Sequence, residues 1–269
     1  MERAGSPVRL STILFAVPHQ LLPNGSAIYL LLLLVALIGS VFWWSRRFRS
    51  DPRLIQIFAG AVIGAFAGAK LAYLLAEGWL HWGHADFWYQ LANGKTILGA
   101  LLGGYAGVEG VKKLVGYREP TGDGFAAVAP LGIALGRLGC LAHGCCLGIA
   151  CESAHWFTVN DGAGMPRWPA PWIELAFNLG AFVVFLWFRH RGILPGQHFH
   201  LYLIAYGLFR FVHEFARDTP RVLGLFSGYQ VLALMVLALG IWGFRKRVSD
   251  SMGPDRRSGL PRDFSTNGE

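Results

Sequence analysis

Charged residues are scarce in this 269-residue chain: Asp, Glu, Lys and Arg make up 15% of it, against about 25% in an ordinary soluble domain. None of them occurs between positions 10 and 45 or between positions 222 and 244. Hydrophobic residues make up 54% of the chain, whereas disorder requires low hydrophobicity and high charge. The apolar residues also stand in long unbroken blocks, and about 20 of them in a row span a bilayer as a helix. The composition therefore excludes both a disordered chain and a soluble globule.

Cysteine is also scarce, and it is confined to one segment. All four cysteines lie between Cys140 and Cys151, which excludes a disulfide framework distributed over the chain. Their spacing matches no familiar zinc pattern, and the adjacent Cys145 and Cys146 are poorly suited to chelating one ion, so neither a metal site nor a cofactor is predicted. Three interpretations stay open. They are small buried filler, a disulfide or redox role such as Cys145 or Cys146 paired with Cys151, and metal binding or a catalytic thiol.

The apolar blocks predict an all-α, polytopic integral membrane protein with about seven transmembrane helices. The expected spans are 27–44, 54–76, 95–111, 125–143, 169–188, 195–215 and 224–244. No linker interrupts them, so residues 1–245 are expected to form a single transmembrane domain. Residues 246–269 are polar and contain glycine and proline, and they are expected to form a disordered tail.

The basic residues predict the orientation of these spans. The net charge of +8 could suggest a nucleic-acid partner, but the charges lie between the apolar blocks, so none is expected. With the N-terminus outside, 15 of the 24 lysines and arginines fall in inside segments and 6 in outside segments. This bias follows the positive-inside rule. The C-terminus is therefore expected in the cytoplasm, and the loop 145–168 on the outer side.

Ionisable side chains within the spans indicate a functional site, because charge is costly inside a membrane. Arg137 lies in the fourth span, and Tyr206, Arg210 and Glu214 follow one another at four-residue spacing in the sixth, with Arg217 just beyond. Two arginines on different helices with one carboxylate leave a surplus positive charge. A guanidinium fork suits phosphate, so a phospholipid headgroup is the predicted ligand. The alternative is that Arg210 and Glu214 only neutralise each other while Arg137 reaches the interface.

Two stripes of glycine at four-residue spacing occur in the second and third spans. The stripes are Gly60, Gly64, Gly68 and Gly99, Gly103, Gly107. Small residues at this spacing let helix backbones approach closely, so helix packing is the simpler explanation. The alternative is that a lipid headgroup passes the second stripe, which makes Gly99 and Gly103 candidate substrate contacts.

Four stretches of the chain resemble the bacterial prolipoprotein diacylglyceryl transferase family. They are TILGALLGGYAG, APLGIALGRLGCLAHGCCLG, PRWPAPWIELAFN and LYLIAYGLFRFVHEFARD. With the seven spans, the likeness extends over residues 25–244. It implies transfer of the diacylglyceryl unit of phosphatidylglycerol to the cysteine thiol of a prolipoprotein signal peptide, in the bacterial cytoplasmic (inner) membrane, with glycerol phosphate as the leaving group.

The resemblance also implies roles for particular residues. The family's functional arginine of the fourth span falls on Arg137, and the arginine and glutamate of the sixth span fall on Arg210 and Glu214. Matches in the fifth-span motif are Arg167, Pro169 and Glu174. The candidate catalytic residues are Arg210, Glu214 and His143, and the candidate substrate-binding residues are Arg137, Tyr206, Arg217, Gly99 and Gly103.

The chain departs from the family at several polar positions. The family's histidine before the third-span glycine run is Leu98 here, and Cys140, His143 and Cys145 replace two asparagines and a glutamate. A thiol attacks as its thiolate and must lose a proton, and the candidate bases are His143 and Glu214. The departures keep alternatives open. These are a transferase with another acceptor, and a phospholipid-binding or thiol-redox membrane protein on the same scaffold.

Overall fold

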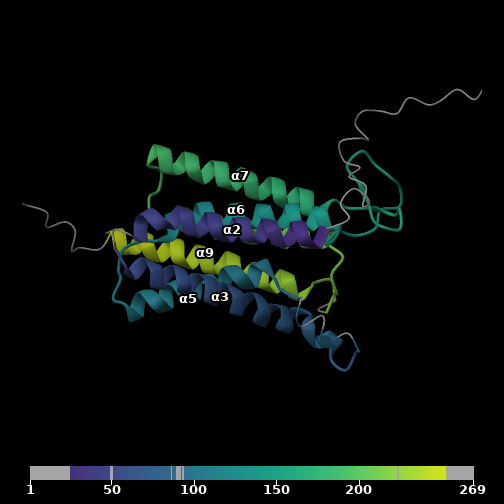
Figure 1. Ribbon diagram of the computed structural model, residues 1–269, viewed down its shortest axis with the longest axis horizontal. Helices are drawn as coiled ribbons and strands as arrows, with labels where there is room; N and C mark the ends of the chain where they lie inside the picture. The colour runs from purple at the N-terminus through teal and green to yellow at the C-terminus, as the bar shows by residue number, and fades with distance from the viewer. Residues whose placement is uncertain are drawn as a thin grey trace, which may run out of the picture.

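The computed structural model describes residues 25–48, 51–85, 87–88, 92, 94–222 and 224–252. Its long helices are α2 (Gly25–Phe48), α3 (Arg53–Ala76), α5 (Ile97–Leu114), α6 (Gly122–His143), α7 (Ala170–Arg191), α8 (His198–His213) and α9 (Gly228–Met252). The short elements are the 3-10 turns η1 (Gly78–His81) and η2 (Glu214–Ala216) and the antiparallel strands β1 (Val159–Asn160) and β2 (Pro166–Arg167). Figure 1 shows the long helices running side by side along the longest axis of the molecule.

The predicted all-α architecture is confirmed, and each predicted span overlaps one of the long helices. Within the described residues, α3, α6 and α7 are long and apolar enough to cross a membrane, and α2 contains a shorter apolar stretch, Leu30–Ser45. Several crossings make the chain a polytopic membrane protein. The number of seven crossings stays a prediction.

Helix α9 continues beyond the predicted end of the last span. It ends at Met252, so residues 246–252 are helical, and the expected disordered tail cannot begin before that point. Lysine and arginine are good helix formers, which explains why the helix passes through Arg245, Lys246 and Arg247. The rest of the expected tail, 253–269, lies outside the described residues, as does the N-terminal segment 1–24.

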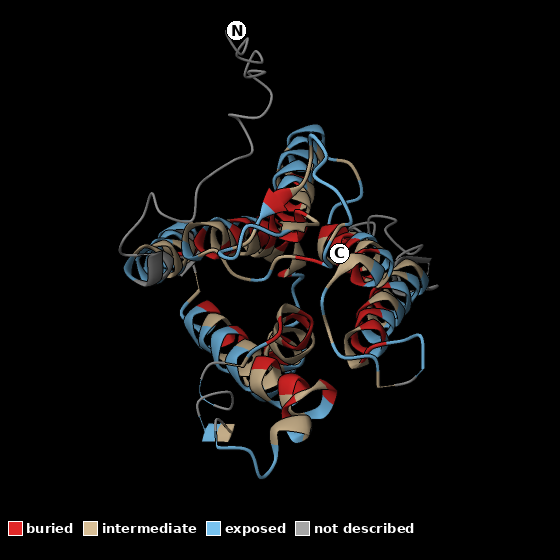
Figure 2. Ribbon diagram, turned by 90° about the vertical axis from the view of Figure 1, so that its right-hand side faces the viewer, coloured by how far each residue is buried: buried red, intermediate tan, exposed pale blue. Residues whose placement is uncertain are grey.

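The helices pack in pairs, with α3 against α5, α8 against α9, and α6 against both α2 and α7. Buried aromatic and aliphatic side chains, among them Leu98, Tyr202 and Tyr206, form the core between them. Large apolar side chains cover the outside as well: Phe66 is 69% exposed and Leu75 is 79% exposed. Figure 2 shows the exposed residues on the outward faces of the helices. Such an apolar exterior suits a lipid environment.

The two glycine stripes close the α3–α5 interface, as the packing explanation predicts. A Cβ on Gly103 would overlap the carbonyl oxygen of Gly64, and a Cβ on Gly99 would overlap that of Gly68. Only glycine permits this approach of two helix backbones. Gly99 and Gly103 therefore face α3, and this packing does not support the expected contact with a lipid headgroup.

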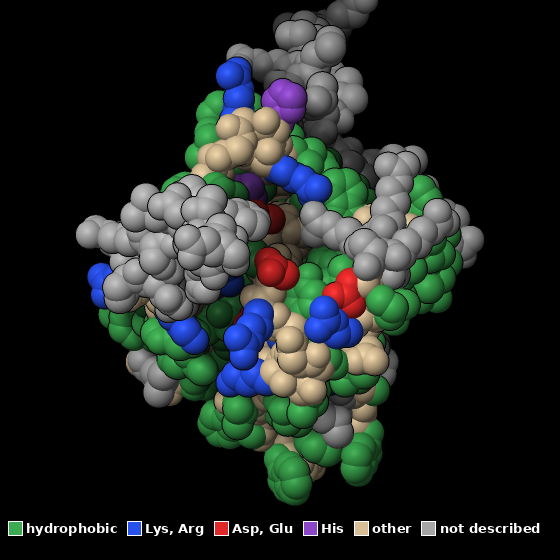
Figure 3. All heavy atoms as spheres, turned by 90° about the vertical axis from the view of Figure 1, so that its left-hand side faces the viewer, with side chains coloured by type: hydrophobic (Ala, Val, Ile, Leu, Met, Phe, Trp, Pro, Cys, Tyr) green, Lys and Arg blue, Asp and Glu red, His purple; other side chains and the backbone are tan. Residues whose placement is uncertain are grey.

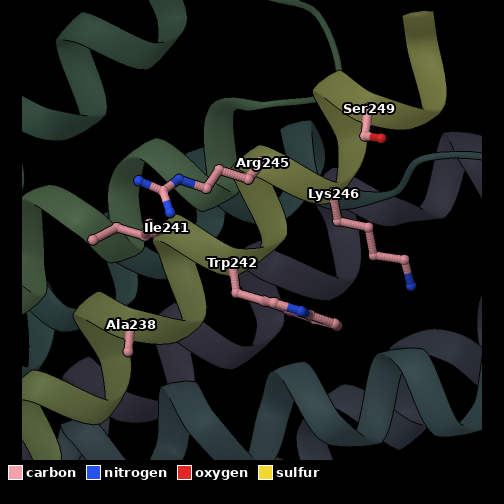
Figure 4. Close-up of a pocket in the computed structure, with 6 residues that line it drawn as sticks. All are labelled: Ala238, Ile241, Trp242, Arg245, Lys246 and Ser249. Atoms are coloured by element: carbon pink, nitrogen blue, oxygen red, sulfur yellow. The ribbon is translucent and has the colours of Figure 1, made fainter. Parts of the chain in front are cut away.

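The surface differs between the sides and one end of the bundle. Figure 3 shows the left-hand end of Figure 1, where lysine and arginine side chains gather, while hydrophobic side chains cover the flanks. A shallow pocket near this end is lined by residues of α9 alone, among them Trp242 and Lys246 (Figure 4). The ammonium group of Lys246 lies 5.1 Å from the Trp242 ring centroid. This pocket shares no residue with the buried charges described next.

Candidate functional site

A cluster of five ionisable side chains, four of them buried and Arg217 partly exposed, lies where α6, α7 and α8 meet. We call it the arginine cluster, and it consists of Arg137, Glu174, Arg210, Glu214 and Arg217. Helix α6 contributes Arg137, α7 contributes Glu174, α8 contributes Arg210, and η2 with the residue after it contributes Glu214 and Arg217. Both glutamates are 0% exposed, and Arg137 and Arg210 are 7% and 4% exposed. Charges buried to this degree in an apolar bundle indicate a function.

Glu174 is the centre of the arginine cluster. Its Oε2 lies 2.8 Å from Nη2 of Arg137, 3.8 Å from Nη1 of Arg210 and 3.9 Å from Nη1 of Arg217. The hydroxyl of Tyr206 donates a hydrogen bond of 2.7 Å to Oε1 of the same carboxylate. One carboxylate thus joins three helices and orients three guanidinium groups.

Glu214 forms the second centre. Its Oε2 accepts a hydrogen bond of 2.9 Å from Nη2 of Arg210 and lies 3.4 Å from Nε of Arg217. The hydroxyls of Thr219 and Ser227 donate to Oε1, at 2.8 and 3.3 Å. All these partners stabilise the ionised carboxylate. Glu214 therefore holds Arg210 and Arg217 in position.

The arginine cluster holds more positive than negative charge. Three guanidinium groups face two carboxylates, which leaves a formal charge of +1. Five of its buried nitrogens have no hydrogen-bond partner among the described residues: Nε of Arg137, Nε and Nη1 of Arg210, and Nε and Nη1 of Arg217. Burial, with the charges of Arg210 and Arg137, lowers the pKa of Arg217 from its ordinary value. Three of these nitrogens form ion pairs with Glu174 or Glu214 at 3.4, 3.8 and 3.9 Å, and an anion bound here would give all five the hydrogen bonds that the carboxylates do not supply.

The loop between α6 and α7, residues 144–169, fixes the position of Arg217. Gly148 forms an isolated antiparallel bridge with Arg217, and the backbone N–H of Ile149 donates to the carbonyl of Ala216 at 3.1 Å. A Cβ on Gly148 would overlap that same Ala216 carbonyl, which accounts for a glycine at this position. Arg167 adds ion pairs with Asp161 at 3.0 Å and Asp218 at 2.8 Å. Arg167 is thus a loop tether and not a member of the arginine cluster.

Three of the four cysteines converge beside the arginine cluster. We call Cys140, Cys145 and Cys146 the thiol cluster, and their sulfur atoms all lie within 4.8 Å of one another. The sulfurs of Cys145 and Cys146 are 3.5 Å apart, and Nη1 of Arg137 lies 3.6 Å from the sulfur of Cys140. Hydrogen bonds from Cys140 and Cys145, together with the charges of Arg137 and Arg217, lower the pKa of the Cys146 thiol.

The disulfide considered from the sequence is absent. All four cysteines are free, and Cys151 stands outside the thiol cluster. The reason lies in the backbone. Helix α6 ends at His143, Gly144 follows in a left-handed conformation with φ of 72°, and the chain turns so that Cys145 and Cys146 fold back towards Cys140, away from Cys151.

The structure brings together most of the predicted site residues. Glu214 is one of the two central glutamates. Four other predicted residues contact Glu174 or Glu214: Arg137, Tyr206, Arg210 and Arg217. His143 is different. It is exposed at the last turn of α6.

Sequence reasoning missed two residues of the site. Glu174 was matched to a motif but given no role, because its place at the centre depends on how α7 is rotated towards α6 and α8. His213 directly precedes Glu214 at the end of α8, and its burial depends on the packing of the bundle. It is 6% exposed, its ring stacks on Phe209 at 5.0 Å, and neither ring nitrogen has a hydrogen-bond partner among the described residues. Its electrostatic neighbours are Arg210, Glu174, Arg217 and Arg137.

Comparison with known proteins identifies related chains. Residues 20–245 match the model of the family described as prolipoprotein diacylglyceryl transferase. A phosphatidylglycerol–prolipoprotein diacylglyceryl transferase of Idiomarina loihiensis is 30% identical over 233 residues, which cover 79% of this chain and 85% of that protein. The Clostridium perfringens protein named transferase 2 is 28% identical over 210 residues, 73% of this chain and 80% of its own length. The Vibrio parahaemolyticus transferase is 27% identical over 216 residues, 77% of this chain and 67% of its own.

Proposed function

The chain belongs to the prolipoprotein diacylglyceryl transferase family, and from this premise we propose that it transfers the diacylglyceryl group of phosphatidylglycerol to the cysteine thiol of a prolipoprotein signal peptide. The observation that carries the proposal is the arginine cluster, with its surplus charge and the five guanidinium nitrogens that have no hydrogen-bond partner among the described residues. A buried site of this kind inside a membrane protein suits the phosphate of a lipid headgroup.

The arginine cluster supports a defined role in the reaction. The acceptor thiolate attacks the glyceryl carbon that bears the phosphate, a carbon–sulfur bond forms, and the carbon–oxygen bond breaks. Glycerol phosphate leaves with the bonding electron pair. Negative charge therefore grows on the phosphate oxygens in the transition state, where the open donors of Arg210 and Arg217 would bind it most strongly. Glu174 and Glu214 hold these donors in place before the substrate arrives.

The proton of the acceptor thiol needs a base that is not already engaged. Glu214 accepts hydrogen bonds from Arg210, Thr219 and Ser227, and His143 is exposed at the end of α6. His213 is buried beside the arginine cluster with both ring nitrogens unpartnered. We therefore assign the proton to His213 in place of the two bases considered from the sequence. A neutral imidazole has one ring nitrogen that can accept a proton.

The alternatives predict other products. A transferase with another acceptor would use the same lipid site and leave prolipoproteins unmodified. The converging thiols of the thiol cluster favour a thiol-redox membrane protein over a simple lipid-binding one, and such a protein would not consume phosphatidylglycerol. Both alternatives keep the same helical scaffold. The first would release a different diacylglyceryl product, and the second would release none.

The proposed site requires access from the outer face of the bacterial inner membrane. The positive-inside bias supports an external N-terminus and a cytoplasmic end of α9. A reporter fused after Met252 should therefore be cytoplasmic, and one inserted near Gly162 should be external. The reverse result for both fusions would overturn this orientation.

Complementation tests the proposed activity directly. Cells depleted of their own transferase should grow when they express this chain, and one chosen lipoprotein should gain the mass of a diacylglyceryl group. Expression of Arg210→Gln in the same cells is the matched control, because it removes a central phosphate donor while the helix remains apolar enough to insert. An unmodified lipoprotein in cells that contain inserted wild-type protein would refute the function.

A further inference from the structure

We propose that the thiol cluster is a zinc site with an open fourth position, and that this position binds the thiol of the acceptor peptide and presents it as a thiolate. The inference rests on the proposed function, because it supplies the activation of the thiol that this reaction needs. It starts from three cysteines that the resemblance left without a role and that the fold brings to the edge of the arginine cluster.

The geometry suits a tetrahedral thiolate site. Zinc–sulfur bonds are about 2.3 Å long, so sulfurs around a tetrahedral zinc are ~3.8 Å apart. In the thiol cluster two sulfurs are 3.5 Å apart, and all three lie within 4.8 Å of one another. The separations therefore bracket the spacing that a tetrahedral zinc requires. Catalytic zinc sites hold three protein ligands and leave one position for water or substrate.

The backbone around the vicinal pair is adapted to this convergence. Gly144 has φ of 72° and Cys146 has φ of 65°, and a left-handed conformation is uncommon for a residue other than glycine. This double turn brings Cys145 and Cys146 back towards Cys140 at the end of α6. It also removes the objection raised by their spacing, because an extended vicinal pair would direct its side chains apart whereas here the two sulfurs are 3.5 Å from each other. Strained conformations of this kind concentrate at functional sites.

The charges complement each other. Zinc with three thiolates would carry a formal charge of −1, which favours a position beside cationic side chains. Nη1 of Arg137 lies 3.6 Å from the sulfur of Cys140, so the guanidinium of Arg137 joins the two clusters. Of the three thiols, Cys140 is buried and Cys146 is exposed, so the guanidinium of Arg137 lies on the buried side of the thiol cluster and the open side remains accessible to an acceptor.

The chemistry of the reaction matches such a site. Zinc held by Cys140, Cys145 and Cys146 would keep the acceptor thiol in its thiolate form, and His213 would take up the proton that is released. The acceptor sulfur forms its bond to the glyceryl carbon as the carbon–oxygen bond breaks, and glycerol phosphate departs with the electrons of that bond. No oxidant or reductant is needed. The metal thus activates the thiol in a chain that has Leu98, 1% exposed in the apolar core, where the family has a histidine.

Cobalt substitution tests the site without relying on activity. The full-length protein is purified in detergent with its thiols reduced, stripped of metal and titrated with Co²⁺, whose thiolate absorption bands report the number of sulfur ligands. One Co²⁺ per chain with thiolate bands is expected, and the bands should intensify when a cysteine-bearing acceptor peptide is added. Cys145→Ser should weaken Co²⁺ binding by at least about tenfold. The matched control Cys151→Ser should bind like the wild type, because Cys151 stands outside the thiol cluster.

The outcomes separate this inference from the proposed function. No thiolate bands, an equal loss in Cys151→Ser, or a vicinal disulfide in the protein as isolated would overturn the zinc site. The zinc site would have no role in activating the thiol if the Co²⁺–thiolate bands did not change on addition of the acceptor peptide. The same conclusion would follow if removal of the metal by a chelator left the transfer rate unchanged. Peptide-sensitive bands in a protein that never consumes phosphatidylglycerol would refute the proposed function and leave the metal–thiol site standing. His213→Gln should keep the bands while it slows the transfer.

Discussion

Two helix interfaces of this protein differ in what holds them together. Between α3 and α5, glycine backbones meet directly, with Gly64 against Gly103 and Gly68 against Gly99. Where α6, α7 and α8 meet, two buried glutamates bind three arginines. The first interface gains its stability from close packing. The second retains surplus charge and unpartnered donors, which burial penalises unless a ligand compensates. The closely packed α3–α5 interface therefore has a structural role. The interface with uncompensated positive charge is suited to binding an anion.

The largest effect on the transfer rate is expected from substitutions in the arginine cluster. Arg210→Gln removes a guanidinium that contacts both glutamates, so transfer should fall by about 10²–10³-fold, the usual cost of losing an oxyanion donor. Arg210→Lys should recover only part of the rate because it keeps the charge and loses the fork. The rate is measured with labelled phosphatidylglycerol and an acceptor peptide. Arg191→Gln on the exposed end of α7 is the control, and equal rates in the two Gln variants would exclude the phosphate role.

Substitutions of His213 and His143 would show which histidine near the arginine cluster accepts the proton. His213→Gln should lower transfer by about 10²-fold, because glutamine keeps the polarity and cannot accept the thiol's proton. His143→Gln should change the rate by less than about threefold, since His143 is exposed at the end of α6. Rates measured across pH would distinguish a proton acceptor from a packing residue. A larger loss in His143→Gln than in His213→Gln would return the base to the exposed histidine.

On the glycine side, the expected effect is on stability and not on chemistry. Gly103→Ala places a methyl group against the Gly64 carbonyl and should destabilise the protein by about 1–3 kcal/mol. Gly110→Ala, on the same helix with nothing within 4 Å, should be neutral or more stable by about 0.5–1 kcal/mol. Thermal unfolding in detergent measures both. If Gly103→Ala left stability unchanged and raised the KM for phosphatidylglycerol, the headgroup explanation would be restored.

The smallest effect is expected in the loop between α6 and α7. Arg167→Ala removes the ion pairs with Asp161 and Asp218, and partly exposed pairs contribute about 0–1 kcal/mol. Backbone hydrogen bonds from Gly148 to Trp168 and from Cys151 to Pro166 remain, so transfer should fall by less than about threefold. Limited proteolysis would report the loosening of the loop.

The same loop predicts a pH dependence. The backbone N–H of Met165 and the guanidinium of Arg167 hold the pKa of Asp161 below its ordinary value. Because the folded-state pKa is lowered, the contribution of Asp161 is present at neutral pH and is lost as the pH falls through the lowered pKa. Proteolysis of the wild-type loop should therefore accelerate on acidification, and Arg167→Ala should show a weaker dependence.

The sequence predicted part of the site because charge inside an apolar block is rare. Arg137, Arg210 and Glu214 could be selected without any structure, since a membrane span tolerates such residues only for a reason. Tyr206 followed from the four-residue spacing that places side chains on one helix face. Glu174 satisfied the same criterion, but its partners lie on other helices, and the rotation of α7 that directs it to Arg137 cannot be obtained from a single helix.

The sequence by itself determined the class of the molecule, the approximate helix positions and the residue types available for chemistry, because hydrophobic blocks and their charged boundaries are local properties of the chain. Tertiary structure alone decided which side chains meet. It turned the glycine stripes towards each other, placed Glu174 between three arginines, buried His213 without a partner and folded Cys145 and Cys146 back to Cys140. The physical reason is that contacts between helices depend on rotation, register and loop geometry, and these are set by packing of the whole bundle.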